Sequence, residues 1–167
     1  SNDGIRLNLV IDGVARSNTV GVTDQANVYT SGYHVFKAWK PILFDGNTFT
    51  AGAADISVRA NNQTTGVSTK YSNIPLFGGF ADSIAMGEVA ERRGQSEAIA
   101  AQRVSSKVLP EFNTEVDAKI VDLNKDYEEK VSAKLRQKDL YPSAASYRST
   151  EDDLRVSTRL MADHELA

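Results

Sequence analysis

The side chains suited to acid–base or metal chemistry are few in this chain. Its two histidines, His34 and His164, lie far apart, and neither His-x-x-x-His nor His-Glu-x-x-His occurs. The local spacing typical of zinc sites is therefore absent. The chain has no cysteine, which excludes disulfides, thiolate ligands and cysteine nucleophiles. The sequence predicts no catalytic residue, no metal site and no cofactor.

Two short segments could bind ions. Glu151, Asp152 and Asp153 form an acidic triplet at a predicted turn, but they lack the spaced ligands of a calcium loop. We interpret the triplet as a solvated turn. Gly78 and Gly79 precede a predicted helix and could offer backbone amides to an anion. Because no glycine-rich phosphate-binding motif occurs, a plain turn into the helix is the favoured interpretation.

The charge balance argues against nucleic-acid binding. The formal net charge is −3 and the isoelectric point about 5.4. Basic residues do cluster in the second half, at Arg92, Arg93, Arg103 and Lys107. Neighbouring glutamates dilute that cluster, so it lacks the basic field that nucleic acid requires. No run of 18 apolar residues is present, and the sequence predicts no transmembrane segment.

The chain changes character near Gly94. All 11 glycines lie at or before that position, among most of the aromatic residues, and this composition favours strands and turns. The glycine-free remainder is rich in Ala, Glu, Lys, Gln and Arg, which favours helix. We expect a single domain with a β-rich part over 3–79, a helical part over 80–139, and a connection with a returning strand over 140–167.

The β-rich part predicts an antiparallel meander of four or five strands. Apolar and polar residues alternate over 5–11 and again over 56–60, which indicates strands with one buried face. Asp45-Gly46 is a hairpin signal between the run 27–44 and Thr48–Thr50. Asp12-Gly13 is either a second hairpin or a bulge inside one long strand.

A long amphipathic helix follows. Its apolar positions are spaced by three and four residues, with charged residues on the opposite face. Pro110 predicts a break or kink near Lys107–Leu109. The apolar stripe, which we expect to form core or an oligomer contact, is Leu109, Phe112, Val116, Ile120, Leu123, Tyr127 and Val131.

The fold class that follows is α+β, with the meander packed on the long helix and a C-terminal strand, 154–160, returning to the sheet. A helix of about 40 residues would be about 60 Å long. A compact globule of this size has a radius of gyration of about 15 Å. We therefore expect an elongated domain.

One apolar stretch, residues 74–80, is the candidate contact surface. Its large side chains could dock a protein partner, a lipid or a membrane surface, or they could close one end of the sheet core. The candidate residues are Ile74, Leu76, Phe77 and Phe80.

Three stretches carry a resemblance to large uncharacterised exported proteins of planctomycete-type bacteria. They are Thr64–Gly78, Gln95–Ala100 and Ser149–Val156. The resemblance implies a piece of a longer envelope protein in an extracytoplasmic setting, and it implies no known activity. The order of elements is also similar to tubular lipid-binding domains, in which a bent sheet wraps a helix around an acyl-chain channel.

The leading hypothesis is a non-catalytic binding or scaffold module, holding a lipid or apolar ligand between sheet and helix. Its partners would be a protein, an apolar ligand or a second copy of the chain. One alternative is an oligomerisation stalk built on the helix over 109–135. Another is a hydrolase or isomerase with an acidic cleft that no motif reveals.

Overall fold

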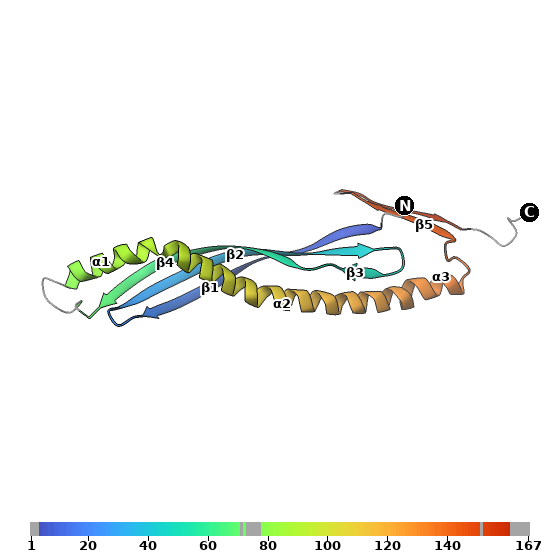
Figure 1. The fold of residues 1–167 in the computed structure, drawn as a ribbon. Coiled ribbons are helices and arrows are strands. Elements are labelled where there is room, and N and C mark those ends of the chain that lie inside the picture. Colours follow the sequence, from blue (N-terminus) through green and yellow to red (C-terminus); the bar gives the residue numbers. More distant parts are fainter. Residues whose placement is uncertain (1–3, 71, 73–77, 151, 161–167) are drawn as a thin grey trace, which may run out of the picture. The chain divides into compact units, whose positions relative to one another are not determined.

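The computed structural model describes residues 4–70, 72, 78–150 and 152–160, with the backbone alone for 78–84. It has the predicted α+β class, with antiparallel sheets and a continuous helix of 45 residues. The elements in chain order (Figure 1) are β1 (Ile5–Val22), β2 (Ala26–Phe44), β3 (Phe49–Ala51), β4 (Asp55–Thr69), α1 (Gly78–Glu91), α2 (Arg93–Tyr127), the π-helical turn η1 (Glu128–Ser132), α3 (Ala133–Gln137), β5 (Ala144–Ser149) and β6 (Leu154–Arg159).

The chain forms two compact units. The first comprises Ser1–Val10, Trp39–Asp55 and Pro110–Ala167, and the second comprises Ile11–Ala38 and Ile56–Leu109. Each unit combines a stretch of sheet with a stretch of helix. The β-rich and helical segments expected from composition are thus both divided between the units.

Strand β2 is the centre of the main sheet. It pairs with β1 on one side and with both β3 and β4 on the other. The hairpin between β1 and β2 closes at Thr23, whose hydroxyl accepts the Ala26 N–H at 3.0 Å. Strand β1 is continuous through Asp12-Gly13, so these residues lie within one long strand and do not form a second hairpin. The ring of Phe36 lies where a Gly13 Cβ would be, so close packing explains this glycine.

The Asp45-Gly46 hairpin signal is confirmed between β2 and β3. Gly46 has a φ of 106°, which side chains with a Cβ rarely adopt. Asp45 Oδ1 accepts the N–H groups of Asn47 and Thr48, each at 2.8 Å. These bonds, that of Asn47 first, lower the pKa of Asp45.

Helix α2 runs unbroken through Pro110, so the break expected near Lys107–Leu109 is absent. A proline in mid-helix costs about 3 kcal/mol. The next turns bury Phe112, Val116 and Ile120. Burial of a large apolar side chain contributes about 1.5–3 kcal/mol, so these residues together outweigh the cost. Pro110 is also where the first unit resumes along the chain.

The apolar stripe of the helix only partly faces the sheet. Phe112, Val116 and Ile120 are buried, Leu109 and Tyr127 are half-buried, and Leu123 and Val131 are exposed. The π turn explains the shift at Val131. Its extra residue per turn rotates the helix, and Ser132 is buried in place of Val131.

Asn124 occupies the inward position next to Leu123. Its side-chain amide donates to Phe49 O at 2.8 Å and accepts from Phe49 N at 2.7 Å. Both partners are backbone atoms of the short strand β3. The Asn124 amide therefore hydrogen-bonds backbone groups at the edge of β3, as a neighbouring strand would.

The first unit has an aromatic core. Phe44 stacks on Phe49 with ring centroids 4.3 Å apart and meets the edges of Tyr127 and Tyr147 at 5.1 and 5.5 Å. Tyr127 donates its hydroxyl to Gly46 O at 3.2 Å. Burial raises the pKa of both tyrosines. The core thus joins the β2–β3 hairpin to the helix and to β5.

The C-terminal strand expected over 154–160 is present as β6. It pairs antiparallel with β5, Tyr147 opposite Val156, and the two form a sheet of their own. The predicted meander therefore gains no strand from this segment.

A buried lysine joins sheet and helix in the first unit. Lys40 of β2 is 1% exposed. Its Nζ donates to Asp117 Oδ1 at 2.6 Å and to Asn113 Oδ1 at 2.6 Å. A buried ammonium is tolerated only when it is paired and hydrogen-bonded.

The lysine contact predicts a coupled effect on stability. Asp117→Ala leaves the ammonium with Asn113 alone and should cost about 2 kcal/mol in urea unfolding, below the range for two fully buried charges because Asp117 is 52% exposed. Lys40→Met with Asp117→Ala should recover most of that loss. Asp126→Ala, which breaks the exposed pair with Lys130, is the control and should cost about 0.5 kcal/mol or less. Equal losses in the single and double variants would contradict the coupling.

Candidate ligand-binding groove

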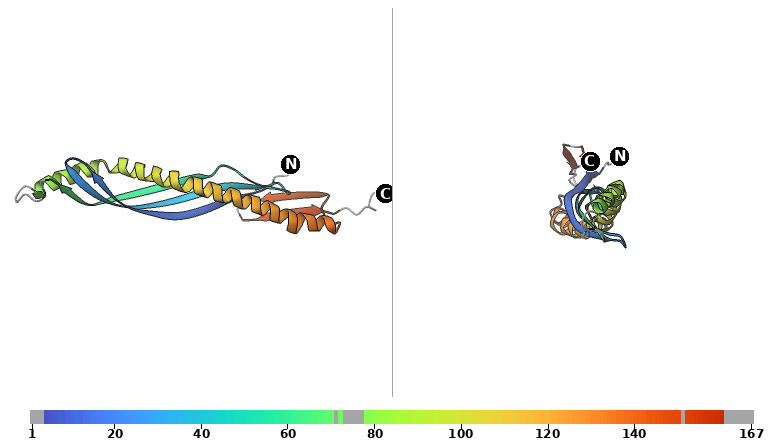
Figure 2. Two further views of the ribbon diagram at one scale, coloured as in Figure 1. Left: turned by 90° about the horizontal axis from the view of Figure 1, so that it is seen from below. Right: turned by 90° about the vertical axis from the view of Figure 1, so that its left-hand side faces the viewer.

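The second unit has a cavity of about 430 Å³ between its sheet and helix α2. Within this unit the helix lies along one face of the strands (Figure 2). Small side chains, Ala15 and Ser17, line the cavity from β1, and Ile99, Ala100, Val104 and Val108 line it from the helix. Small residues on the sheet leave space that larger ones would fill. The result is a hollow with one predominantly apolar wall.

A second cavity, of about 420 Å³, adjoins the first. The two share Thr19, Asn62 and Ser96. Helix residues Met86, Val89 and Ala90 and strand residues Val28 and Thr30 line it further. Both cavities lie along the helix–sheet interface of this unit, and we call the adjoining pair the helix–sheet groove.

His34 is the most buried polar residue of the groove. It is 2% exposed and shares a hydrogen bond of 3.1 Å between its Nε2 and Ser17 Oγ. Its Nδ1 is buried without a hydrogen-bond partner among the described residues. An unpaired buried nitrogen costs about 1–3 kcal/mol. Gly32 leaves room for this pair, because a Cβ there would meet the imidazole ring.

Polar contacts hold the helix against β4 where the two cavities meet. Asn62 donates its side-chain amide to Ser96 Oγ at 2.7 Å and its backbone N–H to Glu97 Oε1 at 3.0 Å. Arg93 donates to the same Glu97 oxygen at 2.9 Å. The Asn62 bond, followed by Arg93 and His34, lowers the pKa of Glu97. The helix is therefore anchored at a fixed point beside the groove.

The charged residues that line the groove from the helical segment are all basic. They are Arg92, Arg93, Arg103 and Lys107. Arg16 of β1 also borders the first cavity, but its guanidinium lies 5.8 Å from the ring of Tyr33 on the other face of the sheet. Arg92 and Arg93 are ion-paired with Glu88 and Glu97. Arg103 and Lys107, one helical turn apart, have no ion pair with any residue that the structure describes. The groove therefore offers two unpaired cations beside an apolar wall.

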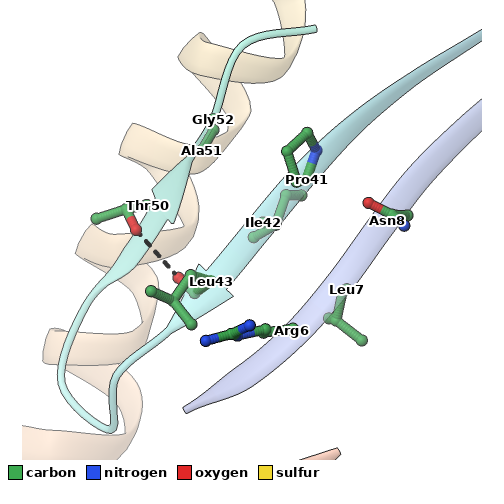
Figure 3. Close-up of a pocket in the computed structure, with 9 residues that line it drawn as sticks. All are labelled: Arg6, Leu7, Asn8, Pro41, Ile42, Leu43, Thr50, Ala51 and Gly52. Atoms are coloured by element: carbon green, nitrogen blue, oxygen red, sulfur yellow. Dashed lines mark hydrogen bonds between the residues drawn. The ribbon is translucent and has the colours of Figure 1, made fainter. Parts of the chain in front are cut away.

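A third hollow, of about 510 Å³, lies in the first unit. Figure 3 shows its lining from β1, β2 and β3, with Thr50 donating to Leu43 O at 3.4 Å. Most of these side chains, including Leu7 and Leu43, are exposed. The helix–sheet groove, by contrast, has the buried side chains of His34 and Asn62 in its lining, so it is the stronger candidate.

The candidate contact surface from the sequence falls mostly outside the described residues. Ile74, Leu76 and Phe77 lie there, as do His164 and Glu151. Phe80 lies in α1, within the stretch whose side chains are not described. The candidate contact surface therefore stays a prediction. Among the residues that it describes, no cluster of three potential metal ligands occurs.

Sequence reasoning did not assign Ser17, Asn62 or Ser96 to a site. They carry no ligand-binding motif, and only the pairing of β4 with β2 and the path of the helix bring them together. The basic cluster was visible in the sequence, and all four of its members line the groove. None of the helices described is long and apolar enough to cross a membrane.

No protein-family model, curated protein or solved structure matches this chain. The groove must therefore be interpreted from its own chemistry.

The Glu97 contact predicts a pH-dependent contribution to stability. A carboxyl whose pKa is lowered on folding stabilises the fold above its ordinary value of 4.5, and it loses that effect as pH falls through the lower folded value. Urea unfolding from neutral pH to about pH 3 should show the loss caused by Glu97→Gln shrinking as the solution is acidified. Glu91→Gln, at an exposed residue of α1, is the control for the lost charge. If the difference in unfolding free energy between Glu97→Gln and Glu91→Gln does not change with pH, the role assigned to the Glu97 carboxylate is wrong.

Proposed function

We propose that this chain is a non-catalytic binding module that holds a single-chain amphipathic anion, of the fatty-acid class, in the helix–sheet groove. The observation that carries the proposal is the pair of adjoining cavities with an apolar helix wall and unpaired basic residues. Grooves of this size suit small ligands, whose burial is driven by apolar contact and oriented by a few polar groups. No acidic residue lines the groove among the described residues.

The charges favour an anionic head group over a neutral one. Arg103 and Lys107 are both exposed, so they can reach a carboxylate without first breaking an ion pair. The alkyl chain would lie against Ala100 and Val104, towards Ser96 and the second cavity.

A setting in a larger exported protein is part of the proposal. It is supported by the resemblance carried by Thr64–Gly78, Gln95–Ala100 and Ser149–Val156. The stalk alternative is less well supported, because Phe112, Val116 and Ile120 are buried within the chain and cannot also contact another copy.

Native mass spectrometry of freshly purified protein tests for a resident ligand. We expect added mass that delipidation removes, and titration with dodecanoate should then restore binding. Dodecanol should bind more weakly than dodecanoate, because it lacks the charge that the two basic residues would pair with. A clean unliganded mass together with no binding of either probe would contradict the proposal.

A groove-filling variant tests the location. Ala100→Phe places a ring in the groove and should weaken dodecanoate binding by about tenfold or more. Ala98→Phe is the matched control, since Ala98 is exposed on the same helix and does not line either cavity. Isothermal titration of both variants should show the loss for residue 100 alone. Equal affinities would place the ligand elsewhere.

A further inference from the structure

Strand β1 forms one edge of the main sheet. Its neighbour in the sheet is β2, and over residues 11–22 no other described segment pairs with it. An edge strand presents unpaired N–H and C=O groups, which can pair with another chain. Proteins usually protect such an edge with prolines or closely spaced charges, and the segment has only Asp12 and Arg16 as charged residues and no proline.

These two charges lie on the face of the sheet away from the helix. Side chains alternate along a strand, and Asp12, Val14 and Arg16 are exposed while Gly13, Ala15 and Ser17 are partly covered. The Arg16 guanidinium lies 5.8 Å from the ring of Tyr33, which belongs to the same outer face. Four residues of strand separate Asp12 from Arg16 by about 13 Å, so the two cannot pair within one chain.

The spacing of Asp12 and Arg16 allows two identical antiparallel strands to place opposite charges against each other. In an antiparallel pair of identical strands, a two-fold axis at Val14 places Asp12 of each copy opposite Arg16 of the other. An axis at Asp12 or at Arg16 would instead bring like charges face to face, which is unfavourable. Any axis between residues would put helix-side residues opposite outer ones and break the continuity of the faces.

We propose that a second copy of this chain pairs with the β1 edge, antiparallel and with the two-fold axis at Val14. The two sheets then continue as one across the interface, a common form of symmetric association. Two Asp12–Arg16 ion pairs fix the register. The exposed Val14 side chains meet at the axis. The ligand groove lies on the opposite face, so this inference does not rest on the proposed function.

Charge reversal tests the register. Asp12→Arg and Arg16→Asp, each alone, should weaken dimerisation by about tenfold or more, because each places like charges opposite one another twice. The double variant restores opposite charges at both positions and should recover the dimer. Light scattering over a concentration series measures the association. A strictly monomeric wild type, or a dimer that neither single change weakens, overturns the proposal.

Cysteine cross-linking tests the axis directly, since the chain has no cysteine of its own. Val14→Cys places two thiols opposite each other and should yield a covalent dimer under mild oxidation. Asn18→Cys, at an exposed residue of the same strand, is the control. Its two copies would lie about 26 Å apart in this register. Cross-linking at residue 18 as fast as at residue 14 overturns the register.

Discussion

A single helix laid on one face of a sheet buries only a narrow strip of side chains, and the rest of the structure depends on how that strip is filled. In the first unit, large side chains fill this strip between helix and sheet. Phe44, Phe112, Val116 and Ile120 are buried there, and the tyrosine edges close the remaining space around Phe44. Well-packed aromatic and aliphatic side chains give this unit its core. They also leave little room between its sheet and helix.

The second unit fills the same strip with small and polar residues. Ala15, Ser17, Thr30 and Ala100 line the groove there, and among the described residues its buried polar side chains are His34 and Asn62. Specific hydrogen bonds, such as Asn62 to Ser96, replace apolar packing as the tie between helix and strand. A fixed helix over small side chains leaves a groove of stable shape, which is the condition for binding a ligand without refolding.

The sequence predicted the layers better than the details of their contact. Alternation indicated parts of β1 and β4, over 5–11 and 56–60. Asp45-Gly46 indicated its hairpin, because both signals are local. The helix stripe failed at Leu123 and Val131, since the Asn124 contact with β3 and the π turn at Glu128–Ser132 are set by the packed structure. The break at Pro110 failed for the same reason, because burial of the following turn outweighs a local preference.

The groove itself was beyond sequence reasoning. Its residues come from four separate segments and carry no motif, and their common property is small size on the inner face. The hypothesis of a ligand between sheet and helix came from element order, and the helix–sheet groove is the place we propose for it. The pairing of Lys40 with Asp117 was equally hidden, because 77 residues separate the two.

The central claim is that the groove holds an alkyl chain between helix and sheet. Intermolecular NOEs between isotope-labelled protein and bound dodecanoate test it most directly. The account predicts contacts from the alkyl chain to the methyl groups of Ala100, Val104 and Val89. Contacts to Val14 and Tyr33 on the outer face instead, or none to either face, would contradict it.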